Sequence, residues 1–227
     1  METHDQHILK VSNLTVELPN QTVLENVSFT LEKGKTLAII GPNGAGKTML
    51  FRALLNLIAY KGKIKWAPGV KIGYVPQYLS ASDIPISVKE FMALRNNSGI
   101  EEALRSVGLN SEEVLHKRLG ALSGGQLRRV LIAWAIIDKP DVLLFDEPTS
   151  GVDLDSEEAI YKMLNGLEED YRITILLISH DLHIIRDYSD YMMALNKCVT
   201  FLGESKRIMD PELQLMIYGE HVCVAHE

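Results

Sequence analysis

One eight-residue segment constrains this chain more than any other: Gly41-Pro42-Asn43-Gly44-Ala45-Gly46-Lys47-Thr48. It fits the pattern G-x-x-x-x-G-K-[ST] and lies between an apolar run, residues 36–40, and a segment with helical spacing, residues 48–58. Glycines let backbone N–H groups turn toward phosphate oxygens, and the start of a helix adds positive potential. We therefore predict a strand, a phosphate-binding loop and a helix; a glycine-rich turn that only caps a helix is the alternative.

Four side chains, two in this loop and two after a later strand, have predicted chemical roles. Lys47 is expected to reach the β- and γ-phosphates of a nucleotide, and Thr48 to ligate Mg²⁺. A second buried strand, residues 142–145, ends in Asp146-Glu147, where open α/β sheets place their ligands. We expect Asp146 to hold Mg²⁺, directly or through water, and Glu147 to activate the attacking water as general base. The alternative is an acidic turn after a strand.

The segment Leu122-Ser123-Gly124-Gly125-Gln126 precedes a predicted helix that runs to about residue 137. Ser123-x-x-Gln126 fits a capping box, which explains the serine and the glutamine without any ligand. A capping box does not explain the two glycines, which cost helix stability unless the backbone must approach something closely. A second anion-binding helix start indicates a phosphate shared between two copies of the chain.

The order of these motifs resembles the ATP-binding cassette (ABC) ATPases over nearly the whole chain. The resemblance implies that Gln77 contacts Mg²⁺ and the water, that His180 contacts the γ-phosphate, and that Asp153 lies in a loop coupling two sites. Ser123, Gly125 and Gln126 would contact ATP bound to the opposite protomer of a head-to-tail homodimer. Considered alone, His180 is more typical of a hydrogen-bonded strand end and Gln77 of a loop.

Two residues depart from the family pattern. Leu18 stands where an aromatic residue usually stacks on adenine, and leucine offers apolar contact without π-stacking. Trp134 stands where the family commonly has arginine, and a core tryptophan is the simpler interpretation.

The alternation of strand and helix patterns predicts an α/β fold with a parallel sheet. We expect a single P-loop NTPase domain over 1–227, of the ABC ATPase type. Residues 1–77 and 142–203 would form the core, with an antiparallel β subdomain whose two or three strands lie within residues 8–31. Residues 78–141 would form a helical insertion, with helix starts at Ser87 and Ser111 and a helix stop at Gly120. Residues 204–227 would form an appendix, and an acidic helix is expected at about 155–170.

Composition excludes several classes of protein. With 46% hydrophobic and 23% charged residues, the chain is neither disordered, collagen-like nor a disulfide scaffold. The net charge of −7 offers no general attraction to nucleic acid, which we do not expect as a partner. No apolar run reaches the roughly 18 residues that span a bilayer, and the start of the chain has no apolar signal segment. The two cysteines fit a reducing compartment, so we expect a cytoplasmic protein.

One nucleotide-binding unit without a membrane span resembles the separate ATPase subunit of a bacterial-type importer. That resemblance implies integral membrane permease subunits, an extracytoplasmic solute-binding protein, and a place on the cytoplasmic face of the inner or cell membrane. Residues 83–88 are similar to zinc and manganese importer ATPases, although a helix start also explains them. The tail with His221, Cys223 and His226 is similar to the ends of metal importer ATPases, although a frayed tail is the simpler interpretation.

The sequence hypothesis is therefore an Mg²⁺-dependent ATP hydrolase that drives import of a divalent metal, zinc or manganese. Two alternatives stay open at this point. The cargo is a non-metal solute, or the chain is a regulatory module that responds to nucleotide and hydrolyses it weakly.

Overall fold

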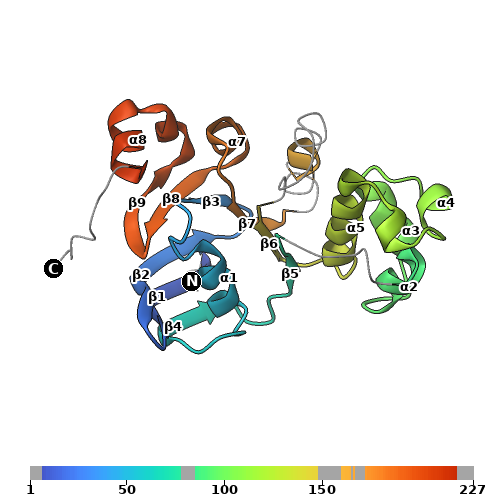
Figure 1. Cartoon of the computed structure of the whole chain (residues 1–227), viewed down its shortest axis with the longest axis horizontal. Helices are drawn as coiled ribbons and strands as arrows, with labels where there is room; N and C mark the ends of the chain where they lie inside the picture. Colours follow the sequence, from blue (N-terminus) through green and yellow to red (C-terminus); the bar gives the residue numbers. More distant parts are fainter. Residues whose placement is uncertain (1–6, 78–84, 148–159, 165, 167–171, 219–227) are drawn as a thin grey trace, which may run out of the picture.

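The computed structural model describes residues 7–77, 85–147, 160–164, 166 and 172–218, which form two sheets and a group of helices (Figure 1). Four expectations lie wholly or partly outside these residues: Asp153, the start of segment 83–88, the tail with His221, Cys223 and His226, and most of the helix expected at 155–170. Within the last of these, residues 160–164 and 166 are helical.

The larger sheet has the strand order β5-β6-β7-β3-β8-β9. Its members are β3 (Thr36–Ile40), β5 (Ile72–Val75), β6 (Val142–Asp146), β7 (Thr174–Ile178), β8 (Tyr191–Asn196) and β9 (Cys198–Glu204). The first five strands in that order pair in parallel, and β9 is antiparallel to β8. Every residue of β3, β6 and β7 is buried, as is typical of parallel strands covered on both faces. The predicted parallel α/β fold is confirmed.

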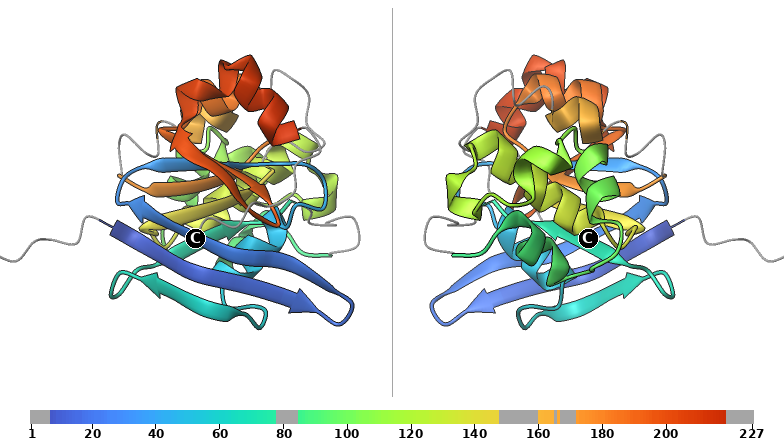
Figure 2. Two further views of the ribbon diagram at one scale, coloured as in Figure 1. Left: turned by 90° about the vertical axis from the view of Figure 1, so that its left-hand side faces the viewer. Right: turned by 90° about the vertical axis from the view of Figure 1, so that its right-hand side faces the viewer.

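The smaller sheet has the order β2-β1-β4 and packs against α1 and the larger sheet (Figure 2). Strands β1 (His7–Leu18) and β2 (Gln21–Glu32) form a hairpin in which Leu18 pairs with Gln21 across a two-residue turn. They are the antiparallel strands expected within residues 8–31. Strand β4 (Lys61–Trp66) was not predicted, because three exposed lysines interrupt its apolar pattern. Lysines on an edge strand discourage pairing with other chains.

Helix α1 (Lys47–Leu54) follows the glycine loop. The expected extension to residue 58 is wrong, because Asn56 takes a left-handed conformation with φ 56° that ends the helix. Helices α2 (Val88–Ala93), α3 (Ile100–Ser106), α4 (Ser111–Val114) and α5 (Gly124–Ile136), with the 3₁₀ turn η1 (Leu119–Ala121), lie to one side of the larger sheet (Figure 1).

These helices share a core with the sheet edge: Met92, Leu104 and Val130 belong to the same buried cluster as Phe145 of β6. Two details of the predicted caps are wrong. Asn110, not Ser111, caps α4 with its side chain, and Gly120 lies inside η1.

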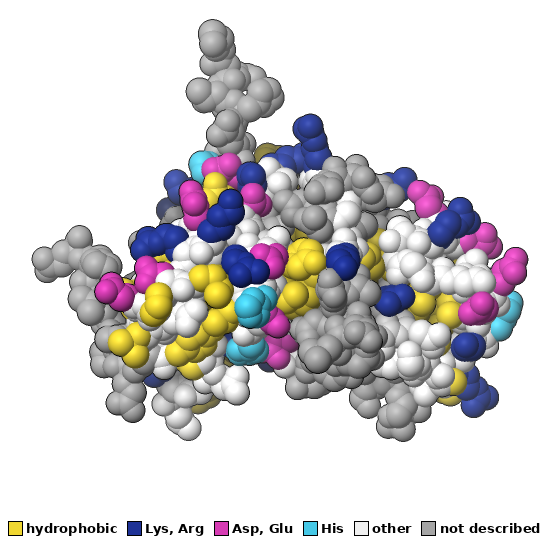
Figure 3. All heavy atoms as spheres, turned by 90° about the horizontal axis from the view of Figure 1, so that it is seen from above, with side chains coloured by type: hydrophobic (Ala, Val, Ile, Leu, Met, Phe, Trp, Pro, Cys, Tyr) yellow, Lys and Arg dark blue, Asp and Glu magenta, His cyan; other side chains and the backbone are white. Residues whose placement is uncertain are grey.

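After β7, the chain continues through α7 (Leu182–Tyr188), β8, β9, η2 (Ser205–Met209) and α8 (Pro211–Tyr218). Strands β8 and β9 were not predicted. Figure 3 shows apolar side chains gathered at the α8 end of the molecule, where Leu215, Met216 and Tyr218 are exposed. Cys198 is disulfide-bonded, which the sequence analysis did not anticipate. Among the described residues, no helix is long and apolar enough to cross a membrane.

Candidate active site

The strand order brings the predicted site residues to one edge of the larger sheet. Four neighbouring parallel strands, β5, β6, β7 and β3, end there. Gln77 follows β5, Asp146 ends β6 and Glu147 comes directly after it, His180 follows β7, and the phosphate loop follows β3. This edge is where open α/β sheets bind ligands.

The shape of the phosphate loop depends on two glycines that pack against neighbouring strands. Gly41 has φ 145°, and a Cβ atom there would lie 2.0 Å from the backbone oxygen of Leu195 in β8. Gly46 has φ 97°, and its Cβ atom would lie 2.5 Å from a methyl carbon of Leu24 in β2. A larger residue at Gly41 would push the loop away from the larger sheet, and one at Gly46 would push it away from the smaller sheet, so both glycines are required even before a phosphate is considered.

Within the loop, Lys47 is buried and turned back on its own backbone. Its Nζ donates hydrogen bonds to the carbonyl oxygens of Gly41 at 2.9 Å and Pro42 at 3.1 Å. Burial lowers the pKa of Lys47, and the nearby Glu147 and Asp146 oppose this shift. The ammonium group therefore lies in the loop as a partly desolvated cation, which an anion would stabilise.

Opposite the lysine, Thr48 Oγ1 donates a hydrogen bond to Asp146 Oδ1 at 3.4 Å. The other carboxylate oxygen, Oδ2, is buried and has no hydrogen-bond partner among the described residues. Burial is also the main cause of the raised pKa of Asp146. A buried carboxylate oxygen beside a threonine hydroxyl is a suitable donor set for a hard cation such as Mg²⁺.

We expect Asp146→Asn to stabilise the folded chain at neutral pH. Because the folded state raises the pKa of Asp146, stability falls as the pH rises through that pKa, and the cost is fully present above it. At pH 7 the variant should therefore melt at a higher temperature than the wild type. The difference should vanish below the ordinary Asp value of 3.8. Calorimetry across this pH range measures it, and a lower melting temperature for the variant at pH 8 contradicts the argument.

Both oxygens of the Glu147 carboxylate are engaged by the two other predicted residues. Gln77 Nε2 donates a hydrogen bond to Oε2, and His180 Nε2 lies 2.7 Å from Oε1. Glu147 itself has a left-handed φ of 45°, unusual for a residue other than glycine. Strain of this kind persists where the surroundings over-determine the backbone, as they do at many active sites.

The predicted capping box at the start of α5 is present. Gln126 N donates to Ser123 Oγ at 3.2 Å, and Ser123 N donates to Gln126 Oε1 at 3.2 Å. Ser123 is exposed, and Gly125 and Gln126 are partly exposed. The helix start is thus accessible from outside the chain.

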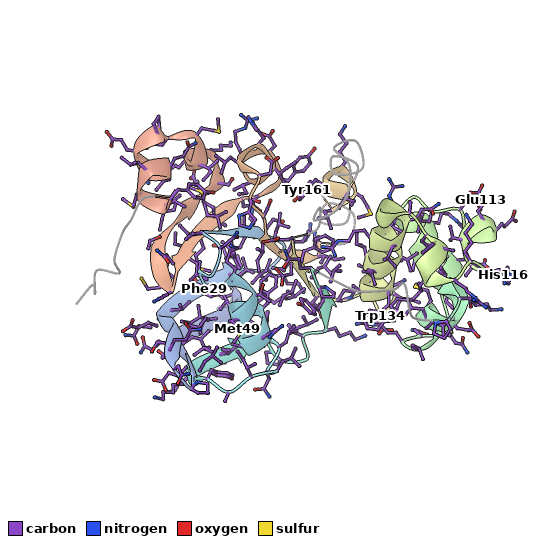
Figure 4. The ribbon with its side chains drawn as sticks, in the orientation of Figure 1. Phe29, Met49, Glu113, His116, Trp134 and Tyr161 are labelled. Atoms are coloured by element: carbon purple, nitrogen blue, oxygen red, sulfur yellow. The ribbon has the colours of Figure 1, made fainter. Side chains whose placement is uncertain are left out.

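The two family departures lie in different places. Leu18 is 41% exposed at the end of β1. Trp134 lies among the helices (Figure 4), partly buried and stacked on Phe91 with ring centroids 5.6 Å apart. The Arg95 guanidinium lies 4.7 Å from the centre of the Trp134 ring. Trp134 therefore packs within the helical group, as the simpler interpretation expected.

Arg128 was missed by the sequence analysis. It lies on α5, is 6% exposed, and donates hydrogen bonds to backbone oxygens on both loops that carry Gln77 and Glu147. The only sign of Arg128 in the sequence is its place in the predicted helix, two residues before the apolar Val130. An arginine at that place could equally be exposed beside a core residue.

The chain is similar to known transport ATPases. Residues 24–150 match the ABC transporter family. Zinc import ATP-binding protein ZnuC 1 of Hahella chejuensis is 35% identical over 216 residues, covering 93% of this chain and 84% of the relative. Zinc import ATP-binding protein ZnuC of Pseudomonas aeruginosa is 35% identical over 238 residues, covering 98% and 88%.

Solved structures share the fold. A chain of a metal-chelate type ABC transporter in an inward-facing conformation superposes with a TM-score of 0.84 at 26% identity, covering 93% of this chain and 88% of that one. CbiO1 of Clostridium perfringens, part of the ABC transporter complex cbiONQ, superposes with a TM-score of 0.78 at 26% identity, covering 93% and 94%.

Proposed function

Because this chain belongs to the ABC transporter family, we propose that it is the ATP-hydrolysing subunit of an importer that carries zinc across a membrane. The observation that supports hydrolysis best is the Glu147 carboxylate, held between Gln77 and His180 beside a phosphate loop. The family likeness alone would fit a chain that binds ATP without cleaving it. A positioned general base supports cleavage.

The partly desolvated ammonium group of Lys47 would bind the phosphates of ATP. The Lys47 ammonium exchanges the carbonyls of Gly41 and Pro42 for phosphate oxygens, while the N–H groups at the start of α1 face the same phosphates. Negative charge on the phosphates opposes the lowering of the Lys47 pKa by burial and so stabilises the ammonium form. Leu18 would offer an apolar contact to the base without stacking on it.

Thr48, Asp146 and Gln77 are the residues that would hold Mg²⁺, which supplies positive charge to the phosphate oxygens when it is bound. The Oδ2 atom of Asp146, which has no hydrogen-bond partner in the described part of the chain, supports this assignment. Thr48 orients the other oxygen of the same carboxylate.

For the chemical step, Glu147 accepts a proton from the attacking water. Gln77 and His180 hold its two carboxylate oxygens, so a water molecule that displaces either contact lies within hydrogen-bonding distance of the base. His180 is exposed enough, at 43% of its side chain, to turn from the carboxylate to the terminal phosphate.

Two copies of the chain, arranged head to tail, would share two ATP molecules. The exposed start of α5 supports this arrangement, since Ser123, Gly125 and Gln126 would approach the phosphates of the partner copy. Asp153 would couple the two sites. Hydrolysis would then break the bond between the β- and γ-phosphates, so the nucleotide would no longer tie the two copies together and the dimer would open.

The subunit works with integral membrane permease subunits. We place it at the cytoplasmic face of the membrane, and the system would include an extracytoplasmic solute-binding protein. Zinc crosses the membrane through the permease and is recognised by the other subunits, so this chain supplies energy for transport and does not select the metal.

The cargo is tested by the metal content of cells. After growth in chelator-depleted medium, cells that lack the protein should contain less zinc than the parent, with manganese and iron unchanged, as measured by elemental mass spectrometry. Wild-type protein and the matched variant Lys63→Met, altered on exposed β4, should restore zinc; Glu147→Gln should not. A selective loss of manganese would identify manganese, and not zinc, as the cargo. Unchanged metal contents would exclude metal import, and the ATPase assignment would then be tested separately by measuring ATP hydrolysis.

A further inference from the structure

Arg128 connects α5 to the residues of its own chain that are proposed to carry out hydrolysis. The residue lies on α5, four positions after Gly124, the first residue of the helix. Its side chain is buried at the junction between the helices and the larger sheet. Its guanidinium carbon lies 5.6 Å from the centre of the Phe145 ring in β6. An arginine this deeply buried needs partners that compensate for its lost hydration.

The hydrogen bonds of this guanidinium go to two loops at once. Nη1 donates to the carbonyl oxygens of Pro76 at 2.6 Å and Gln77 at 3.4 Å. Nη2 donates to those of Asp146 at 3.0 Å and Glu147 at 2.7 Å. One planar fork therefore joins the end of β5 to the end of β6, a span that the rigid geometry of arginine suits better than a single ammonium.

The bridged backbones carry the side chains that meet in the active site. Glu147 has a left-handed backbone conformation, and hydrogen bonds fix both of its backbone polar groups. Its N–H donates to the carbonyl oxygen of Ile178 at 3.1 Å, and its carbonyl oxygen accepts from Arg128. Gln77, which donates to the Glu147 carboxylate, is held through its own carbonyl by the same guanidinium. Moving α5 by a fraction of an ångström would move both backbones together.

We propose that Arg128 is a positioning residue, which sets the geometry of Gln77 and Glu147 and makes it depend on the position of α5. The inference rests on the proposed ATPase function and adds a path between the two sites of the dimer. The start of α5 would contact ATP bound to the partner copy. Arg128, one turn further along α5, would then make the position of Glu147 in its own chain depend on the position of the helix. Arg128 contacts neither substrate nor water in this role.

The test is steady-state ATP hydrolysis by the complex of this chain with its permease. In Arg128→Met, kcat should fall about 10- to 100-fold, the range expected when a catalytic group is misplaced by up to 1 Å. The KM for ATP should change by less than about twofold, because the phosphate loop is untouched. Arg105→Met is the matched control: it removes an exposed arginine from α3 and should leave both constants unchanged.

Arg128→Lys separates positioning from simple packing. Lysine keeps the buried stem and charge but lacks the fork, so the variant should melt close to the wild type while kcat stays at least about fivefold low. If Arg128→Met does not fold, Arg128→Gln provides the same comparison with a neutral donor. A kcat within about twofold of the wild type in the Lys variant, or a parallel loss of kcat and ATP affinity, overturns the proposal.

The wild-type protein in the same assay keeps the two conclusions apart. Absence of hydrolysis by the wild-type complex would remove the proposed function. Normal hydrolysis by wild type together with normal hydrolysis by Arg128→Met would remove only the positioning role.

Discussion

Glu147→Gln should bind ATP as the wild type does and hydrolyse it about 10²- to 10⁴-fold more slowly, the usual contribution of a general base. Glutamine is nearly isosteric and keeps an oxygen that accepts a hydrogen bond from Gln77, so the network at the sheet edge changes little. What it lacks is a basic oxygen for the proton of the attacking water. Single-turnover hydrolysis and equilibrium binding of radiolabelled ATP measure the two steps separately.

The matched control for this variant is Glu113→Gln. Glu113 is exposed on α4, at the far end of the helical group (Figure 4), and its exchange should leave turnover unchanged. If Glu147→Gln turns over within about twofold of the wild type, Glu147 is not the general base. If it loses ATP affinity instead, the carboxylate serves binding and the base lies elsewhere.

Lys47→Met should lose ATP binding by at least about 100-fold, because the charge-assisted contacts to the phosphates have no replacement. The variant should nevertheless fold at least as stably as the wild type at pH 7. Burial lowers the pKa of Lys47 in the folded state, so the charged lysine costs folding free energy below that pKa, and this cost disappears as the pH rises through the ordinary value of 10.5. Methionine fills the same volume without the charge.

Equilibrium ATP binding and thermal melting at pH 7 and 10 check both parts of this prediction. Lys63→Met, on the exposed edge strand β4, should match the wild type in both measurements. Retained ATP affinity in Lys47→Met would mean that backbone N–H groups alone hold the phosphates. A large drop in its melting temperature would mean that the bonds to Gly41 and Pro42 stabilise the loop more than burial of the charge destabilises it.

The fold was predictable where the sequence pattern is local and strong. The apolar run that forms β3 and the hairpin of β1 and β2 are examples, since alternation and continuous burial leave clear patterns. Strands β4, β8 and β9 were not found. Lysines mask β4, and β9 pairs antiparallel with β8 at the edge of the sheet, where half-exposed side chains blur the pattern. The end of α1 was misjudged because Asn56 stops it through its own backbone conformation.

The candidate site divides in a similar way. The phosphate loop, Asp146 and Glu147 were proposed from motifs that lie within a few residues of one strand end. Gln77 and His180 came from resemblance to a family, and the structure places both against the Glu147 carboxylate. Arg128 came from neither source, since an arginine on a helix usually faces solvent.

By itself, the sequence determined that this chain forms a parallel α/β core with a phosphate loop after β3 and two carboxylates at the end of β6. Those features depend on apolar runs, glycines and charges within a few residues of one another. Only the tertiary structure decided that Gln77 meets Glu147, 70 residues away, and that one guanidinium holds Pro76, 52 residues away, together with Glu147. Such contacts follow from strand order and helix packing, which no local pattern encodes.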